Sequence, residues 1–352
     1  MISCFKGRGL AFLALAGLSV ARAGTLFITP VFGSSITSSG NSAAIEGSIN
    51  TAISTLEGLY ATPTASSLTI TINYTYTAAG AGNLLSTDQD YYSASYSAYK
   101  TALTADSVAN PTNTVLATAI ANLPAGNDAS GADPIVMSGA LYAALGLTPS
   151  EAPGDTDNVT ININSIQNFA FTQSSVGSGQ FDLIGGLEHE MDEVLGGGGG
   201  GSNLNALADG ACNPGSMLAF FCGQYGPLDL YRYGAPGVPS FSDVNFGTSI
   251  SYLSVDGGVT NIVAFNQNTG GDLGDFYPNC GNGGGTGELI QNAFNCSGGP
   301  DEAYTTSSPE FAMEESIGWD SGVSATPEPG TLGLFGASLV SLVFLRRRFS
   351  RK

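Results

Sequence analysis

The sequence predicts an α+β fold in which a mixed sheet is backed by helices and leads to a helix with one polar face. Alternating apolar residues indicate strands at 25–32, 68–76 and 157–164. Apolar residues at helical spacing indicate helices at 41–60 and 181–196. The 49 glycines and the low charged fraction, 11%, indicate long ordered loops, and we expect a loop-rich C-terminal subdomain.

The first elements read as strand, helix and strand. Ile45, Ile49 and Ile53 repeat at helical spacing between the strands at 25–32 and 68–76. A connection of this length joins parallel strands through a crossover helix. We therefore expect the first two strands to be parallel neighbours, with the helix packed on one face of their sheet.

The segments that follow are predicted to be mainly helical. We expect helices at 91–106 and 111–122, the second with Asn110 as its cap and Pro111 in its first turn. A short strand and a helical turn are expected at 134–144. Near the end of the chain, two elements are expected: a hairpin at 251–258 and a helix at 308–317 with Ser308 as its cap.

The N-terminus has the features of a secretory signal peptide. Lys6 and Arg8 precede an apolar run at 10–18, and Ala21-Arg22-Ala23 forms an A-x-A cleavage site. We expect residues 1–23 to be removed and the mature chain to begin at Gly24, in a compartment outside the cytoplasm.

The C-terminus combines three features in order. Pro-Glu-Pro at 327–329 is followed by an apolar run at 332–345 and by arginines at 346–348. This order resembles the PEP-CTERM sorting signal of Gram-negative bacteria, and an ordinary single-pass anchor is the alternative. The resemblance implies transient membrane anchoring by the apolar helix, processing by an exosortase, and a final place at the cell surface or in the extracellular matrix. It also divides the chain into a body, 24–322, and a sorting segment, 323–352.

The body of the chain is strongly acidic. Between residues 24 and 326 lie 28 of the 29 acidic residues but only two of the ten basic ones, Lys100 and Arg232, which gives a net charge of −26. Such a surface repels nucleic acid and anionic lipid, so we expect no nucleic-acid partner. The charge is compatible with calcium binding, and solubility alone is the simpler explanation for most of the acids.

Four cysteines remain after the signal peptide: Cys212, Cys222, Cys280 and Cys296. An even number in an exported chain indicates disulfides, and four cysteines allow three pairings. We expect the local pairs Cys212–Cys222 and Cys280–Cys296, because each would close a glycine-rich loop. A cysteine zinc site is disfavoured because no C-x-x-C spacing occurs.

The helix expected at 181–196 carries the chain's single histidine, His189. Glu190 follows it, and Glu193 lies four residues after it, so His189 and Glu193 share one helix face. Gly196 is expected to end the helix. The opposite face is an apolar stripe, formed by Ile184, Leu187, Met191, Val194 and Leu195. The alternative to a metal site is an ordinary helix with one exposed histidine among scattered acids.

This helix resembles the HExxH helix of the zincin metalloproteases, in which two residues at i and i+4 bind zinc and the intervening glutamate is the general base. The resemblance implies zinc binding by His189 and Glu193, with Glu190 as the catalytic base. Here the second ligand is a carboxylate. Gly196 matches the glycine of the metzincin pattern, but the third metzincin histidine would fall at Gly199.

A third ligand must then come from farther along the chain. We expect Asp229, in the segment 225–237, to supply it, and Tyr233 or Tyr231 to polarise a scissile carbonyl group. Arg232 is expected to neutralise a buried carboxylate or to act in catalysis. The loop at 270–275, Gly-Gly-Asp-Leu-Gly-Asp, offers two carboxylates, either as a calcium site or as a plain turn.

Several segments together resemble a group of secreted, metalloprotease-like HExxE proteins that often carry a PEP-CTERM tail. They are His-Glu-x-x-Glu-Val-Leu-Gly at 189–196, Leu-Asp-Leu-Tyr-Arg-Tyr-Gly at 228–234, Gly-Gly-Asp-Leu-Gly-Asp-Phe at 270–276 and Ile-Gly-Trp-Asp at 317–320. The resemblance implies a zincin-like fold and a metal-dependent peptidase. Its metal would be Zn²⁺ or another divalent ion, and its substrate would be a peptide or a protein. The alternative is an acidic, matrix- or surface-binding protein that has lost turnover, and the convergence of His189, Glu193 and Asp229 would distinguish the two.

Overall fold

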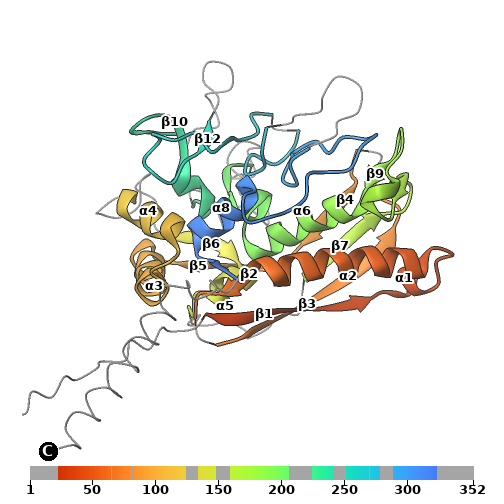
Figure 1. Ribbon diagram of the computed structural model, residues 1–352, viewed down its shortest axis with the longest axis horizontal. Helices are drawn as coiled ribbons and strands as arrows, with labels where there is room; N and C mark the ends of the chain where they lie inside the picture. Colours follow the sequence, from red (N-terminus) through yellow and green to blue (C-terminus); the bar gives the residue numbers. More distant parts are fainter. Residues whose placement is uncertain are drawn as a thin grey trace, which may run out of the picture.

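The computed structural model has an α+β architecture, with a mixed six-stranded sheet packed against helices (Figure 1). The structure describes residues 23–64, 66–80, 82–123, 134–147, 159–205, 224–240, 251–268, 270–277 and 288–322. Residues 1–22 of the predicted signal peptide (1–23) and the predicted sorting segment, 323–352, lie outside this description. Within it, no helix is both long and apolar enough to cross a membrane.

The six-stranded sheet has the strand order β14-β2-β1-β3-β7-β4. Its centre is parallel, because β3 pairs in parallel with both β1 and β7. The outer strands β2, β14 and β4 are antiparallel to their neighbours, which makes the sheet mixed. The strands are β1 (Gly24–Phe32), β2 (Tyr60–Thr62), β3 (Leu68–Thr77), β4 (Leu85–Asp88), β7 (Val159–Asn164) and β14 (Asp320–Ser321).

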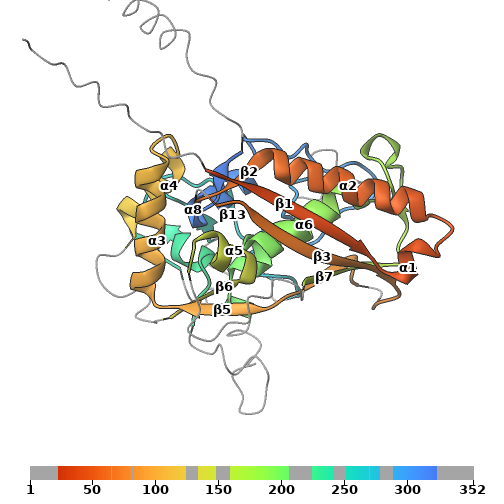
Figure 2. The same ribbon diagram turned by 90° about the horizontal axis from the view of Figure 1, so that it is seen from below.

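One face of the sheet is covered by α2 (Ser42–Leu59) and α6 (Leu183–Leu195), which lie beside each other (Figure 1). Viewed from below, β1 and β3 cross in front of α6, and α2 lies beside β1 (Figure 2). The alternation in β3 explains this layer, since Ile70, Ile72 and Tyr74 are fully buried while the intervening residues are more exposed. The predicted crossover from β1 through α2 to β3 is confirmed.

The segment predicted as one helix at 91–106 contains a strand followed by a helix. Strand β5 (Tyr91–Ala94) pairs with β6 (Ile135–Ser138), and α3 (Tyr96–Ala109) begins after Ser95, whose hydroxyl accepts a hydrogen bond from the N–H of Ala98. Tyrosine favours a strand where a partner strand is present, so pairing with β6 overrides the helical pattern.

The next helix, α4 (Thr114–Asn122), begins three residues later than predicted. Its cap is Asn113, which accepts from the N–H of Leu116 at 2.9 Å, whereas Asn110 ends α3. Pro111 lies in the turn between the two helices. The expected strand and helical turn at 134–144 are present as β6 and α5 (Gly139–Ala144).

The remainder of the described chain is loop-rich, as predicted. Strands β10 and β12 pair, and β12 pairs with β13, so the predicted hairpin is formed by β12 and β13 around a longer loop than expected. Helix α8 begins with Pro309 directly after Ser308. The short elements are α1 (Ser34–Thr37), β8 (Phe169–Ala170), β9 (Phe181–Asp182), β10 (Arg232–Ala235), β11 (Val238–Pro239), β12 (Tyr252–Leu253), β13 (Val263–Ala264) and α8 (Pro309–Ile317).

Candidate metal site

Helix α6 is fixed at both ends. Asp182 caps its N-terminus by accepting from the N–H of Ile184 at 3.0 Å. Gly196 ends the helix with a φ of 105°, a left-handed conformation that glycine adopts without strain. The indole N–H of Trp319 donates to the carbonyl of Leu195 at 2.9 Å, which satisfies a carbonyl that has no partner within the helix.

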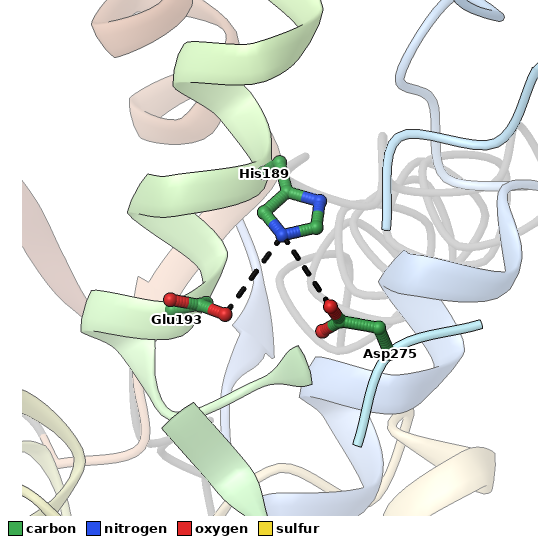
Figure 3. A group of neighbouring side chains, drawn as sticks. All are labelled: His189, Glu193 and Asp275. Atoms are coloured by element: carbon green, nitrogen blue, oxygen red, sulfur yellow. Dashed lines mark ion pairs between the residues drawn. The ribbon is translucent and has the colours of Figure 1, made fainter. Parts of the chain in front are cut away.

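The polar face of α6 brings His189 and Glu193 together with Asp275 (Figure 3). One ligand atom from each of the three residues lies within 4.8 Å of the others. Nε2 of His189 is 3.8 Å from Oε1 of Glu193 and 3.7 Å from Oδ2 of Asp275. An imidazole nitrogen and two carboxylate oxygens therefore face one point.

The imidazole of His189 is oriented by the loop that follows residue 288. Its Nδ1 lies 2.9 Å from the carbonyl oxygen of Ile290. A carbonyl oxygen can only accept, so Nδ1 carries the hydrogen, and in the neutral ring Nε2 has the lone pair. This carbonyl contact is the one commonly made by metal-binding histidines. The amide nitrogen of Gln291 lies 3.2 Å from Nε2 and donates to Oδ1 of Asp275 at 3.0 Å.

The glycine run after α6 forms part of the site. It folds into a short 3₁₀ helix, η2 (Gly198–Gly201), and the N–H of Gly199 donates to Oδ1 of Asp275 at 2.8 Å. A Cβ at Gly199 would lie 2.5 Å from Oε1 of Glu193, and a Cβ at Gly198 would lie 2.0 Å from the amide nitrogen of Gln291. These two positions therefore require glycine because the backbone approaches the polar side chains closely.

The electrostatics of the site favour a bound cation. Burial, and then the charge of Glu190, raise the pKa of Glu193 well above the usual carboxyl range. Burial, and then the charge of Asp272, do the same for Asp275. Carboxylates in this position are destabilised unless a proton or a cation compensates them. One imidazole and two carboxylates form a donor set that fits zinc, and the oxygen share also suits harder ions such as Mn²⁺.

Glu190 lies next to this group and is buried, with a relative exposure of 7%. The hydroxyl of Thr87, on β4, donates to its Oε2 at 2.6 Å. Burial raises the pKa of Glu190 to about 6, even though the neighbouring His189 lowers it. The carboxylate is thus held by a strand of the sheet and is more basic than a solvated glutamate.

These residues line a cleft of about 450 Å³. Its lining includes the edge strand β4 with the residues before it, and the loops at 270–275 and 292–295. Gly186 allows β4 to approach, since a Cβ there would lie 2.7 Å from a methyl carbon of Leu85. The cleft therefore places residues of β4, the terminal strand of the sheet among the described residues, beside the candidate metal ligands.

The structure does not bring Asp229 to this group. Asp229 is buried in the 3₁₀ helix η4 (Leu228–Tyr231), where its carboxylate accepts from the hydroxyl of Ser202 and from the N–H groups of Asn203 and Gly226. The oxygens of Asp229 thus accept hydrogen bonds from neighbouring residues of the fold. The third candidate ligand is Asp275, and the prediction of Asp229 is wrong. Asp275 lies in the loop at 270–275, which was expected to be a turn or a calcium site. Its two acids in a glycine-rich loop are the sequence feature that could have indicated a metal ligand.

Tyr233 and Arg232 also lie away from the cleft lining. Tyr233 is mostly buried in β10 and packs against Gly258. The guanidinium of Arg232 donates to the carbonyls of Leu273 and Asn266, so it holds the loop that carries Asp275. These partners are carbonyl oxygens, and the expected interaction with a buried carboxylate is limited to the charge of Arg232 lowering the pKa of Asp229 against the larger effect of burial.

Cys296 is disulfide-bonded. Cys212, Cys222 and Cys280 lie outside the described residues, so the expected pairs Cys212–Cys222 and Cys280–Cys296 remain predictions.

Comparison with known families identifies the C-terminal segment. A model of the PEP-CTERM protein-sorting motif matches residues 325–348. The motif implies export, sorting to the cell surface and processing by an exosortase, in agreement with the prediction from the Pro-Glu-Pro, apolar and arginine segments. No curated protein sequence and no solved structure matched the chain.

Proposed function

We propose that the body of this chain is a cell-surface, metal-dependent peptidase with a zincin-like arrangement. The observation that carries the proposal is the convergence of His189, Glu193 and Asp275 beside Glu190 in one cleft. A helix that presents a histidine, a glutamate directly after it and a second ligand one turn later agrees with the HExxE resemblance of the sequence.

The three converging residues would hold the metal, which is zinc or a harder divalent ion. When bound, such an ion acidifies water and polarises a carbonyl group. The two carboxylates neutralise its charge, and the Nδ1 contact of His189 with the carbonyl of Ile290 keeps Nε2 directed at the site.

Glu190 acts as the general base in this proposal. Its carboxylate accepts one proton from the attacking water as the oxygen bonds to the peptide carbonyl carbon. It then gives that proton to the leaving amine when the C–N bond breaks, and the carboxylate is regenerated. Thr87 positions the group through its hydrogen bond to Oε2, which leaves the other oxygen to exchange the proton.

The shape of the cleft supports a peptide substrate. Strand β4 is the edge of the six-stranded sheet and its residues 85–87 line the cleft. A strand edge has backbone N–H and C=O groups that can pair with an extended chain, and this pairing does not depend on the side chains of the bound peptide. Tyr233 has no part in this proposal because it does not line the cleft.

A binding protein without turnover is the second candidate. The observation that favours it is the donor set, since a single imidazole with two carboxylates makes a bound metal a weaker Lewis acid than two or three imidazoles would. The raised pKa of Glu190 and its place in the cleft favour the peptidase.

Metal analysis and hydrolysis of an unstructured protein substrate test the proposal together. We expect about one metal ion per chain in the wild type and in Glu190→Gln, and none in His189→Ala. Glu190→Gln should lose at least about 100-fold in rate. Metal binding with equal hydrolysis in wild type and Glu190→Gln would contradict the mechanism. Metal binding with no hydrolysis would support the second candidate.

A further inference from the structure

Asp301 is a buried acid whose carboxylate has no partner within the described part of the chain. The residue is 6% exposed, and both carboxylate oxygens are fully buried without a hydrogen bond. A carboxylate in this state is destabilised unless a proton or a cation compensates its charge. A buried polar group in this state needs an explanation.

Two other buried carboxylates adjoin Asp301. Its own N–H donates to Oδ2 of Asp182 at 3.4 Å, and its backbone forms a parallel bridge with Glu288. Asp182 is fully buried and Glu288 is 1% exposed. We name Asp182, Glu288 and Asp301 the Asp301 cluster. Two further buried acids, Glu188 and Glu310, act electrostatically on Asp301.

The local backbone accommodates this arrangement. A Cβ at Gly185 would lie 1.7 Å from Oδ2 of Asp301, so any side chain at this position in the first turn of α6 would displace the carboxylate. Glu288 is already directed by the N–H of Cys296 and by the amide of Asn292, both of which donate to it. The fold therefore brings these acids together and provides no cationic side chain among the described residues that contact them.

We propose that the Asp301 cluster binds a structural Ca²⁺ ion, with Asp301 and Glu288 as its principal carboxylate ligands. Calcium accepts six to eight oxygens, and backbone carbonyls and water can complete its shell around two carboxylates. Mg²⁺ requires a near-octahedral shell and fits such a site less well. The PEP-CTERM motif implies a cell-surface location, where weak calcium sites are effective.

The site would act on the loop that supports the histidine. Glu288 and Asp301 lie at the two ends of a segment that contains Ile290, whose carbonyl orients His189, and Gln291. A cation that joins these ends to the N-terminus of α6 would hold the loop against the site helix.

Thermal unfolding of chelator-treated full-length protein, with and without 10 mM Ca²⁺ (on the order of ten times or more the Kd of a weak extracellular site), tests the inference. We expect calcium to raise the Tm of the wild type by about 3–8 °C and to have no effect on Asp301→Asn. His189→Ala should keep the calcium shift, which separates this site from the proposed catalytic metal. Glu302→Gln, a neighbouring exposed acid, is the matched control and should also keep the shift.

The Asn substitution also separates calcium from a proton. Asn resembles a protonated Asp, so if Asp301 only holds a proton, Asp301→Asn will match the wild type with and without calcium. A wild-type Tm that calcium does not move would overturn the inference. So would a shift that is retained in Asp301→Asn and lost in His189→Ala, or an equal shift with Mg²⁺. If Asp301→Asn does not fold, Glu288→Gln and calcium calorimetry on wild type and His189→Ala decide between the same outcomes.

Discussion

The backbone N–H of Gly199 donates a hydrogen bond to Oδ1 of Asp275 at 2.8 Å. Gly199 is the position at which a metzincin pattern would have its third histidine. In this chain the residue at that position contributes its backbone and holds the side chain that joins the site from another loop. The glycine run is therefore a structural part of the candidate metal site.

Gly199→Ala should weaken metal binding. The added Cβ would lie 2.5 Å from Oε1 of Glu193 and 2.8 Å from Cγ of Asp272, so the carboxylates must move apart. We expect metal affinity, measured by competition with a chromogenic chelator, to fall at least about 10-fold. The control is Gly47→Ala on α2, where a Cβ meets nothing within 4 Å and should stabilise the helix by about 0.5–1 kcal/mol. Equal affinity in both variants would exclude a role for Gly199.

Asp275→Asn should reduce metal binding, whereas Asp229→Asn should reduce stability. We expect Asp275→Asn to lose metal by more than the roughly 10–100-fold cost of a change outside the ligand shell. Asp229→Asn should bind metal normally but unfold at a lower temperature, because its three hydrogen bonds are donated to a buried carboxylate. Metal content and a thermal melt of each variant make the comparison. Loss of metal in Asp229→Asn with an unchanged melt would restore Asp229 as a ligand.

Thr87→Val should slow catalysis without removing the metal. Valine keeps the volume of the side chain but cannot donate to Glu190, whose carboxylate would then be less well positioned. We expect kcat to fall about 10-fold, with KM and metal content unchanged. Thr69→Val, at an exposed position of β3, controls for the substitution itself. A change in KM alone would indicate that Thr87 contacts substrate and does not position the base.

Asp106 and Asp320 are neighbouring buried carboxyl groups whose interaction makes stability depend on pH. Burial, and then the charge of Asp320, raise the pKa of Asp106 to about 8, and burial raises that of Asp320 to about 6. The folded state therefore binds protons more tightly than the unfolded state, and stability from this pair is lost as pH rises from about 4 to 8.

Asp106→Asn should remove part of this pH dependence, because the amide is neutral and can still donate to Asp320. Urea unfolding at pH 5 and pH 8 measures it. The wild type should lose free energy of unfolding between pH 5 and pH 8, and we expect the variant to lose roughly 1–3 kcal/mol less than the wild type. Glu46→Gln, on the partly exposed surface of α2, should leave the difference unchanged. If the variant has the same free energy of unfolding as the wild type at both pH values, the Asp106–Asp320 pair is not the source of the pH dependence.

The regular elements could be predicted because one face of each is buried. The alternation in β3 and the isoleucines of α2 reflect contacts with a single layer, so the pattern determines both the element and its orientation. The segment at 91–106 was predicted wrongly because the partner of β5, strand β6, lies more than 40 residues away in sequence. Local periodicity contains no information about such a partner.

The site residues also fall into those that the sequence pattern could predict and those that it could not. His189, Glu190 and Glu193 could be identified because helical spacing fixes their relative positions. Asp275 could not be chosen over Asp229, because both lie in irregular segments. Their places depend on contacts such as that of Arg232 with the carbonyl of Leu273. Irregular loops have no repeating pattern, and the acidic body of the chain offers many other carboxylates as candidate third ligands.

The last strand of the sheet ends almost where the sorting motif begins. The N–H of Gly322 donates to the carbonyl of Leu59 at 2.7 Å, directly after β14 joins β2. The motif match starts at residue 325. Proteolytic removal of the motif therefore leaves every strand of the six-stranded sheet in place. A cut only a few residues earlier would remove β14 and detach Trp319 from the end of the site helix. Only residues 323 and 324 separate the described fold from the sorting motif, so processing within the motif would leave the support of the site helix intact.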